Sequence, residues 1–352
     1  MKVFCVIIFG MLFAVGLNLV LNELCTTPTS RLGRCIQPQN CQSILRIQQI
    51  RPDLRTSVDA SILQRSNCGS LGTNGDPSFC CPILENESSC GASEVGNRIF
   101  GGTETTIGEH PWAALLMYRV GASRFQTQCG GTLISRRYVL TAAHCIENVP
   151  RNWKLEYVRL CEWDLADPNE CVQIGNDTVC RQNYEIEETT VHSHFDRSSN
   201  ALPNDIALLK LKNVVQFGKY IKPICLPLDN ALRNMPINQH QFTVVGWGQT
   251  EIAPRSSVQI QVVVTGKNNR VCNDMLRNRG VLLTDSQLCV GGEEGKDSCR
   301  GDSGGPLMRQ VEVKWYLTGL VSFGERQCGS RNHPSVYTNV EKYLDWIENV
   351  IS

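Results

Sequence analysis

The sequence predicts an all-β fold behind a small disulfide-rich module, and three observations support this expectation. The 352-residue chain has many short apolar segments bounded by turn residues, such as residues 205–211 after Pro203 and Asn204. It has 18 cysteines, which is too many for a reducing compartment. Six of them lie in residues 25–81, a stretch too small for much of a hydrophobic core. We therefore expect two parts, each held together by disulfides.

The N-terminus predicts export from the cell. Lys2 precedes an apolar run over residues 3–20, as in a secretory signal peptide, and we place that peptide at residues 1–21. A single-pass membrane anchor is the alternative, but Asn18 interrupts the run and Glu23 follows it. No later segment approaches the roughly 20 apolar residues of a membrane span. The expected location is extracellular, with no membrane partner.

The charge balance argues against nucleic acid as a partner. The chain carries 34 basic and 34 acidic residues, so its formal net charge is +0 at pH 7. A balanced chain offers no electrostatic attraction for a phosphate backbone. The sequence also lacks internal repeats and low-complexity tracts.

The run Gly301-Asp302-Ser303-Gly304-Gly305 has the composition of a nucleophile loop. A serine hydroxyl is a poor nucleophile at neutral pH, so chemistry at Ser303 needs a base and donors for the developing oxyanion. An ordinary glycine-rich turn is the alternative. His144 ends one apolar segment and Asp205 opens another. The order His, Asp, Ser along the chain is that of chymotrypsin-type triads, and it differs from the order in subtilisin-like and α/β-hydrolase enzymes.

From Ile99 to Ser352 the chain resembles the trypsin-like serine proteases of the chymotrypsin family. The resemblance implies a serine endopeptidase made of two packed six-stranded antiparallel β-barrels, with the catalytic residues between them. The apolar spacing of Tyr343, Leu344, Ile347 and Ile351 adds a C-terminal amphipathic helix over residues 340–351. The matching segments are residues 99–102, 111–112, 129–134, 140–145, 205–208, 246–248, 301–306, 321–324 and 334–338.

The resemblance assigns a role to each member of the triad. Ser303 attacks the scissile carbonyl, His144 accepts the proton and later returns it, and Asp205 orients the imidazole. The backbone N–H groups of Gly301 and Ser303 form the oxyanion hole. Catalysis is expected to need no cofactor.

Asp297 is the predicted determinant of specificity. It stands six residues before Ser303, where trypsin-like enzymes have the base of the S1 pocket. A solvated aspartate in a polar stretch is the alternative. The resemblance implies cleavage after Arg or Lys, with Arg preferred for its bidentate reach to a carboxylate. Ser322 and Gly324 are further substrate-binding candidates, and Ser335 replaces a usual glycine and narrows the pocket.

Activation is the second implied mechanism. Residues 96–102 resemble a zymogen cleavage site, at which a cut after Arg98 frees the ammonium group of Ile99. In the family this new terminus pairs with the aspartate before the nucleophile, here Asp302, and the pair shapes the oxyanion loop. The alternative is that Arg98 is a linker arginine.

The cysteines of residues 25–81 resemble those of the clip domain of arthropod proteases. Sequence alone allows fifteen pairings of six cysteines. The resemblance selects three, and it assigns residues 82–98 to a linker. The whole chain thus resembles an arthropod clip-domain serine protease of the easter or prophenoloxidase-activating type. The three implied bonds are Cys25–Cys80, Cys35–Cys68 and Cys41–Cys81.

The protease resemblance also implies disulfides in the larger part. One of them, Cys90–Cys225, would keep the two chains joined after cleavage. Cys171–Cys180 is the natural local pair in an inserted loop. Cys161 is then left as a free buried thiol, with an intermolecular bridge or a competing bond to Cys171 or Cys180 as alternatives. The remaining implied pairs are Cys129–Cys145, Cys272–Cys289 and Cys299–Cys328.

Two further features are weaker. Four carboxylates lie in a loop where family members often hold calcium, and a solvated acidic loop is an equal alternative. Asn86 and Asn176 begin glycosylation sequons. The candidate ligands of a structural calcium ion are Glu162, Asp164, Asp167 and Glu170.

These features predict a secreted zymogen acting in a proteolytic cascade of arthropod haemolymph, in Toll signalling, prophenoloxidase activation or developmental patterning. Its expected partners are a protein substrate, such as a downstream zymogen or pro-ligand, an upstream activating protease and a serpin-type inhibitor. The alternatives are a digestive trypsin and a catalytically silent clip-domain cofactor, which the intact triad disfavours.

Overall fold

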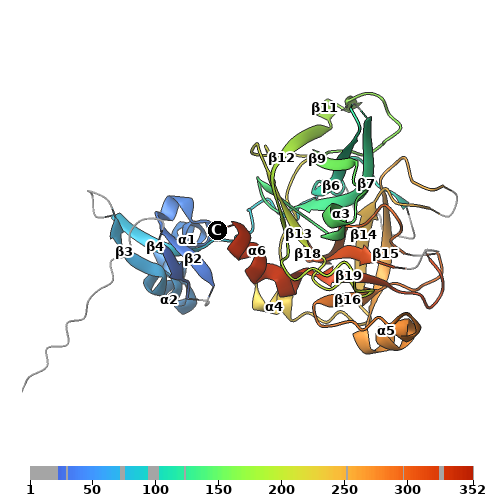
Figure 1. Ribbon diagram of the computed structural model, residues 1–352. Helices are drawn as coiled ribbons and strands as arrows, with labels where there is room; N and C mark the ends of the chain where they lie inside the picture. The colour runs from blue at the N-terminus through green and yellow to red at the C-terminus, as the bar shows by residue number, and fades with distance from the viewer. Residues whose placement is uncertain are drawn as a thin grey trace, which may run out of the picture. The chain divides into compact units, whose positions relative to one another are not determined.

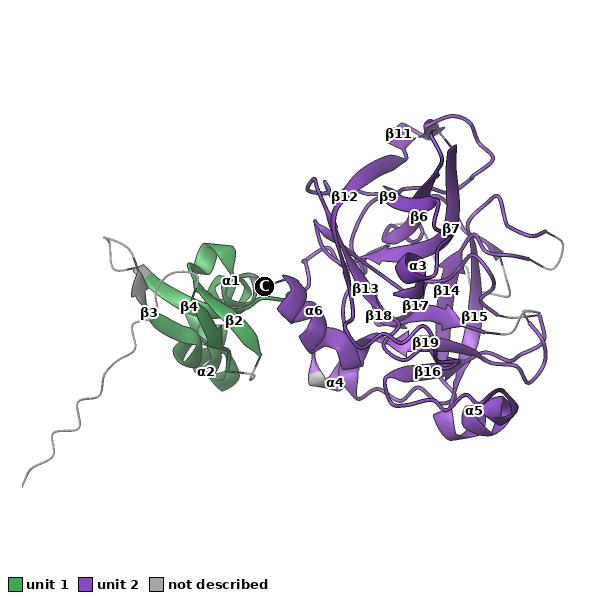
Figure 2. Cartoon of the chain, viewed as in Figure 1, with its two compact units in different colours: residues 1–85 green, residues 86–352 purple. Residues whose placement is uncertain are grey.

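The computed structural model describes residues 23–28, 31–71, 76–93, 103–122, 124–250, 253–295, 297–324 and 329–351. The chain divides into two compact units, residues 1–85 and residues 86–352 (Figure 2). The signal peptide expected at residues 1–21 lies outside the described residues. Within the described ranges, every helix is too short or too polar to cross a membrane.

The first unit is a four-stranded antiparallel sheet with the strand order β1-β2-β4-β3, accompanied by two helices (Figure 1). Helix α2 begins at a capping box, in which Thr56 and Asp59 each accept a hydrogen bond from the other's backbone N–H. The elements are β1 (Leu24–Thr26), β2 (Leu32–Ile36), α1 (Gln42–Gln49), α2 (Ser57–Ser66), β3 (Asn67–Leu71) and β4 (Asp76–Pro82).

Disulfides supply much of the interior of this unit. Cys80 and Cys81 are adjacent on β4, and successive side chains of a strand point to opposite faces. Cys80 therefore bonds Cys25 on β1, while Cys81 bonds Cys41 at the start of α1. A third disulfide joins Cys35 to Cys68, so all three implied pairs are present. The buried apolar cluster consists of Cys41, Ile44, Phe79 and Cys81.

The second unit contains two closed barrels, as expected from the sequence. The first is a six-stranded antiparallel barrel with the order β12-β13-β8-β7-β6-β9. Its strands are β6 (Ala113–Val120), β7 (Arg124–Leu133), β8 (Tyr138–Thr141), β9 (Trp153–Leu160), β12 (Gln182–Val191) and β13 (Ala207–Leu211).

The second barrel has the order β14-β17-β18-β19-β16-β15, and pairing of β14 with β15 closes it. The short strand β5 (Thr103–Glu104) extends it at β15. The barrel strands are β14 (Gln241–Gly246), β15 (Ile260–Lys267), β16 (Gln287–Val290), β17 (Pro306–Val311), β18 (Lys314–Phe323) and β19 (Ser335–Asn339).

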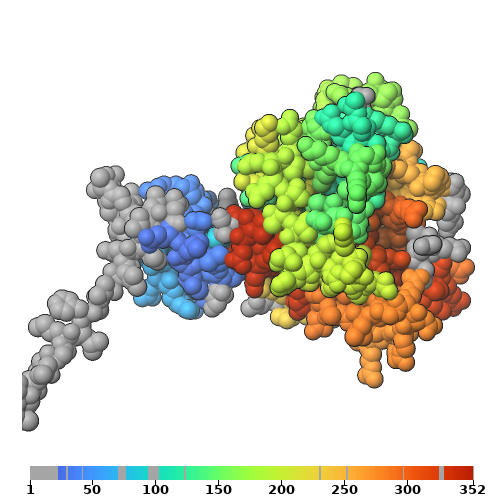
Figure 3. Space-filling model, viewed as in Figure 1, coloured from blue at the N-terminus to red at the C-terminus, as the bar shows by residue number. Residues whose placement is uncertain are grey.

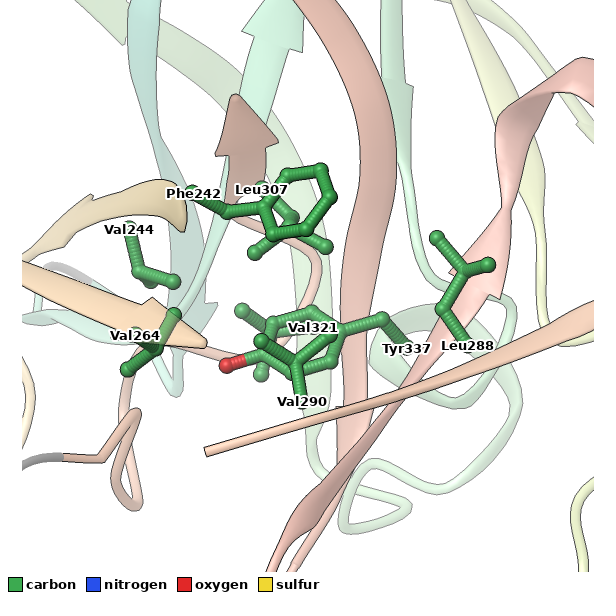
Figure 4. Close-up of a cluster of buried hydrophobic side chains, with 8 residues drawn as sticks. All are labelled: Phe242, Val244, Val264, Leu288, Val290, Leu307, Val321 and Tyr337. Atoms are coloured by element: carbon green, nitrogen blue, oxygen red, sulfur yellow. The ribbon is translucent and has the colours of Figure 1, made fainter. Parts of the chain in front are cut away.

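The interior of the second barrel is filled by side chains from all six of its strands (Figure 4). Each is at most 4% exposed, and burying one such side chain contributes roughly 1.5–3 kcal/mol. Leu307 lies on the strand that follows the Ser303 loop, and the Val321 carbonyl accepts the N–H of Gly304 in that loop. The core is therefore directly connected to the loop. The cluster comprises Phe242, Val244, Val264, Leu288, Val290, Leu307, Val321 and Tyr337.

Helices lie at the ends of the barrel strands. The C-terminal helix was predicted over residues 340–351, but its first turn is a 3-10 helix, Val340–Tyr343, and α6 runs over Leu344–Ile351. Tyr343, Leu344 and Ile347 are buried, as the apolar spacing predicted. The other helices are α3 (His144–Glu147), α4 (Asn230–Arg233) and α5 (Asn269–Leu276).

Residues 86–93, in the middle of the linker expected at residues 82–98, belong to the second unit and pack within it. Cys90 bonds Cys225, the N–H of Gly91 donates to the Pro223 carbonyl at 2.9 Å, and the N–H of Trp315 donates to the Gly91 carbonyl at 3.0 Å. These contacts fix the segment that precedes the expected cleavage site. Arg98 and Ile99 themselves lie outside the described residues.

Candidate active site

The three expected catalytic residues come from different elements. His144 opens α3 directly after β8, Asp205 precedes β13, and Ser303 lies in the loop before β17. The N–H of Gly130, on first-barrel strand β7, donates to the Ser303 carbonyl at 2.8 Å. The loop of the second barrel is thereby fixed against the first. In the space-filling view, green first-barrel surface borders orange and red second-barrel surface (Figure 3).

Asp205 and His144 form a hydrogen-bonded pair. The Nδ1 atom of His144 lies 2.8 Å from Oδ2 of Asp205, and the backbone N–H of His144 donates to Oδ1 at 2.9 Å. The Asp205 side chain is 0% exposed and the His144 side chain 14%. When Nδ1 donates to the carboxylate, Nε2 is the nitrogen that can accept a proton. The pair has the geometry of an oriented general base.

Two side chains of the second barrel hold Asp205 in place. The hydroxyl of Ser322 donates to Oδ2 of Asp205, and the hydroxyl of Thr338 donates to the Asp205 carbonyl at 2.7 Å. Ser322, a predicted substrate-binding residue, therefore directs its side chain to the Asp205 carboxylate. Thr338 lies in the matching segment of residues 334–338, but its contact was not predicted, because that motif does not say which residue 133 positions earlier it meets.

The Ser303 loop is anchored by main-chain hydrogen bonds. The N–H of Gly304 donates to the Val321 carbonyl at 2.8 Å, and that of Gly305 donates to the Asp302 carbonyl at 2.8 Å. Gly304 has φ +75°, and a Cβ there would lie 2.2 Å from Oγ1 of Thr141. No other residue fits this position.

The anchored carbonyls also set the direction of two N–H groups. The Arg300 carbonyl accepts from the N–H of Gln249 at 2.8 Å, and the Asp302 carbonyl accepts from Gly305. In a trans peptide the C=O and N–H groups point in opposite directions. The N–H groups of Gly301 and Ser303 therefore point away from these two anchors, and their role as an oxyanion hole stays a prediction.

The Cys129–Cys145 disulfide lies beside the triad. The Sγ atom of Cys145 is 3.8 Å from Nε2 of His144 and 3.6 Å from the Ser303 carbonyl oxygen. The histidine ring and the serine loop thus both lie within 4 Å of one sulfur. Among the described residues the one compact group of metal-binding side chains is Cys129, His144 and Cys145, and its sulfurs are consumed by the disulfide.

Asp302 is a buried carboxylate beneath the loop. Its oxygens accept the N–H of Gly248 at 2.8 Å and the N–H of Cys299 at 2.9 Å. Burial raises the pKa of Asp302, and these two donors together with the nearby charge of Arg255 oppose the rise. A buried carboxylate of this kind is stabilised when a further cation approaches it.

Asp297 is buried beside Ser335. The hydroxyl of Ser335 donates to Oδ1 of Asp297 at 2.7 Å, while Oδ2 is buried without a hydrogen-bond partner in the described part of the chain. Burial raises the pKa of Asp297 to about 6, against the hydrogen bonds from Ser335 and from the backbone of Gly329 and Ser298. A buried carboxylate oxygen without a partner is stabilised when a cation approaches it.

The acidic loop does not fit a calcium site. Calcium prefers six to eight oxygen ligands around one point. Glu162 instead accepts two guanidinium groups, from Arg159 at 3.1 Å and Arg181 at 3.0 Å. Asp164 and Asp167 each accept backbone N–H groups of their own turns, from Ala166 and Asn169. Arg181 had no signal in the sequence, because it follows the loop rather than belonging to the acidic run.

Cys161 is a free thiol, as predicted, and it is partly rather than fully buried. It has φ +58°, a left-handed conformation in which glycine is the residue without strain. Burial raises the pKa of Cys161 to about 11, with the charge of Glu162 as a second cause. The thiol is therefore protonated at neutral pH and is a weak nucleophile.

The other expected disulfides and the sequons can also be placed. Cys171 and Cys180 face each other across the hairpin of β10 (Cys171–Ile174) and β11 (Asp177–Cys180) and are bonded, as are Cys272 and Cys289. Cys299 is disulfide-bonded, and Cys328 lies outside the described residues.

The two sequon asparagines differ in their surroundings. Asn176 is exposed in the turn between β10 and β11. The Asn86 side chain is half-buried, donating to the Leu226 carbonyl and accepting the Leu226 N–H, both at 2.8 Å. The amide of Asn86 thus contributes to fixing residues 86–93.

Comparison with known proteins decides the family. A model named Trypsin matches residues 99–347, and a model of the regulatory CLIP domain of proteinases matches residues 25–81. The chain belongs to the clip-domain serine proteases. As a clip-domain protease it is a trypsin-like serine endopeptidase, and enzymes of this kind need no cofactor for catalysis. Clip-domain proteases are typically secreted.

Similar proteins span nearly the whole chain. CLIP domain-containing serine protease B15 of Anopheles gambiae is 44% identical, over 96% of this chain and 93% of that protein. Melanization protease 1 of Drosophila melanogaster is 34% identical, over 92% of each. The crystal structure of the Drosophila Grass clip serine protease of the Toll pathway matches with a TM-score of 0.64 and 33% identity, covering 94% of this chain and 98% of that one.

Proposed function

We propose that this clip-domain protease is a secreted zymogen, activated by cleavage after Arg98, that cuts a protein substrate after Arg or Lys in an extracellular cascade. The observation that carries the proposal is the hydrogen bond between buried Asp205 and partly buried His144, beside the Ser303 loop. The names of its relatives associate such proteases with melanization and the Toll pathway. Haemolymph is the proposed location, and a serpin-type inhibitor would end the reaction.

The roles proposed for the site follow its geometry. His144, held by Asp205, removes the proton of Ser303 as the hydroxyl attacks the scissile carbonyl. The N–H groups of Gly301 and Ser303 stabilise the oxyanion. His144 then protonates the leaving amine, and water hydrolyses the acyl-enzyme by the same route.

The proposed domain boundaries are a signal peptide at 1–21, a clip domain at 25–81, a linker at 82–98 and a protease domain at 99–352. Because Cys90 is bonded to Cys225, a cut after Arg98 would leave the clip domain covalently attached. The clip domain could then recruit a partner to the active protease. A glycan is proposed at the exposed Asn176.

Fluorophosphonate labelling tests the enzymatic part of the proposal. The Arg98-cleaved protein should be labelled at Ser303, and the uncut protein should react far more slowly. Absence of labelling after cleavage would instead support a silent cofactor. The Arg98-cleaved protein, without the label, is then incubated with candidate zymogens. A cascade protease should cut one or a few of them at a single site, whereas a digestive trypsin should degrade many proteins.

Binding of a cation at Asp297 should depend on pH. Because burial raises the pKa of Asp297 to about 6, the carboxylate is charged above that pH and neutral below it. Benzamidinium, a planar cation, should bind a cleaved Ser303→Ala protein with constant Kd above pH 7, and Kd should rise about tenfold per unit well below pH 6. Calorimetry on this inactive variant measures binding alone, so the effect of His144 protonation on turnover does not enter the result. A Kd that stays flat from pH 5 to pH 8 would contradict the role of Asp297.

A further inference from the structure

Ser335 occupies space and a hydrogen-bonding position beside the proposed substrate cation. It opens β19, is 1% exposed, and donates its hydroxyl to Oδ1 of Asp297 at 2.7 Å. A Cβ on Gly324 would lie 2.3 Å from Oγ of Ser335, so the hydroxyl lies directly against the backbone of Gly324. The side chain therefore fills volume that a glycine would leave open.

The same contacts leave Asp297 with unequal oxygens. Oδ1 already accepts from Ser335, whereas Oδ2 is buried without a partner among the described residues. The next residue, Ser298, is also buried, and its Oγ accepts from the hydroxyl of Tyr337 at 2.9 Å. The surroundings of the cation thus offer one open carboxylate oxygen and nearby hydroxyl oxygens.

We propose that Ser335 is a specificity-determining residue that shifts the preference of this protease from Arg towards Lys at the residue before the scissile bond. A guanidinium pairs best with both oxygens of a carboxylate in a parallel fork. An ammonium is a compact charge that can use one carboxylate oxygen and donate its other protons to hydroxyl oxygens. The added Cβ and Oγ of Ser335 also disfavour the larger guanidinium. The inference rests on the proposed function and reverses the Arg preference expected from the sequence.

Paired substrates test this inference. Two peptide anilides that differ only in Arg or Lys before the scissile bond are assayed with the Arg98-cleaved full chain, after active-site titration. In Ser335→Gly the Arg-to-Lys ratio of kcat/KM should rise about tenfold. In Ser335→Ala, which lacks the hydroxyl but retains Cβ, the rise should be smaller. A variant that is merely less folded would have a lower kcat/KM for both substrates, and the Arg-to-Lys ratio would not change.

The outcomes separate this inference from the proposed function. A wild-type enzyme that hydrolyses both substrates, with the same ratio in all three proteins, would overturn the role of Ser335. A wild-type enzyme that cleaves neither substrate would overturn the proposed function instead.

A second and independent observation concerns Arg181 and the acidic loop. Its Nη1 donates to Glu162 at 3.0 Å, and its Nη2 donates to the carbonyls of Asp167, at 2.6 Å, and Asn169. The Glu162 side chain is 3% exposed and that of Arg181 13%. One carboxylate and two main-chain carbonyls, the donor set that suits a hard cation, are therefore gathered around a single guanidinium.

We infer that the guanidinium of Arg181 takes the place of a metal ion in this loop, so that the loop folds without calcium. A buried carboxylate needs a paired charge, and Arg181 supplies that charge to Glu162. The same guanidinium donates to two loop carbonyls and so joins them to Glu162. Arg159 also donates to Glu162, at 3.1 Å, but its Nε donates to the side chain of Asn183 on β12 rather than to a loop carbonyl. Arg159 thus provides a matched control that lacks the carbonyl contacts.

Thermal unfolding of the full chain, with Ser303→Ala to prevent autolysis, tests the inference. The parent protein should have the same Tm in EGTA and in calcium. Arg181→Gln should lower Tm by about 5 °C in both conditions, and Arg159→Gln by less. Arg181→Glu, which adds a carboxylate where the guanidinium lay, should be unstable in EGTA and regain Tm on addition of calcium.

Three results would overturn this second inference. They are a fall in Tm of the parent protein in EGTA, an Arg181→Gln protein as stable as the parent, and an Arg181→Glu protein that is equally unstable with and without calcium. The last result would show that the oxygens do not surround a position that a cation can occupy.

Discussion

Replacement of Ser303 by alanine is expected to lower kcat of the Arg98-cleaved protein by on the order of 10⁶-fold. The variant keeps the Asp205–His144 pair and the backbone N–H groups but has no atom that can attack the scissile carbonyl. His144→Ala should cost nearly as much, because the members of such a triad act as a unit. The double variant should be little worse than either single one.

Hydrolysis of a small arginyl ester by active-site-matched protein measures this loss. Ser198→Ala is a suitable control, because Ser198 is an exposed serine whose hydroxyl bonds only to nearby Asp196 in the described contacts. A Ser303→Ala protein within tenfold of the wild type would exclude Ser303 as the nucleophile. It would then favour the binding-cofactor interpretation of this chain.

Asp302→Asn is expected to lower the activity of the cleaved protein by on the order of 10²- to 10⁴-fold. The reason is the loss of the proposed buried ion pair between Asp302 and the new terminus at Ile99, because removing one partner of such a pair costs about 3–5 kcal/mol. The asparagine can still accept the N–H groups of Gly248 and Cys299, but it carries no charge for the ammonium. The active conformation of the oxyanion loop is then less stable relative to its inactive conformation.

Three proteins make this test decisive. Arg98→Gln, which an Arg-specific activator cannot cut, should show the basal activity of the zymogen, and cleaved Asp302→Asn should approach that value. Asp274→Asn serves as the control, because Asp274 forms an exposed pair with Arg277. Full activity of uncut Arg98→Gln, or of cleaved Asp302→Asn, would disprove activation through this pair. Circular dichroism establishes that each variant is folded.

Much of the fold followed from the order of short motifs. The two closed barrels and the three disulfides of the first unit agree with expectation. The C-terminal helix differs only in its first turn, which is a 3-10 helix. Motifs of this kind are informative because they constrain local backbone shape and residue chemistry at the same time.

The candidate site was predictable where its residues carry their own local pattern. His144, Asp205 and Ser303 each stand in such a pattern, and the structure brings Asp205 onto His144. Gln249 and Arg181 have no such pattern, and the pattern around Thr338 does not reveal its contact with Asp205. They act through contacts with residues far away in the sequence, or through a guanidinium whose target is known only once the loop is folded.

By itself, the sequence determined the class of chemistry and the identity of the residues that could react, because these depend on covalent groups and their order. The disulfide pairs came from the family resemblance, since six cysteines alone allow fifteen pairings. Only the tertiary structure decided which partners those groups have. It showed Arg181 among oxygens that suggested calcium, and Ser335 on one oxygen of Asp297. The physical reason is that charge pairing and hydrogen bonding act over a few ångströms, and folding, not chain order, sets those distances.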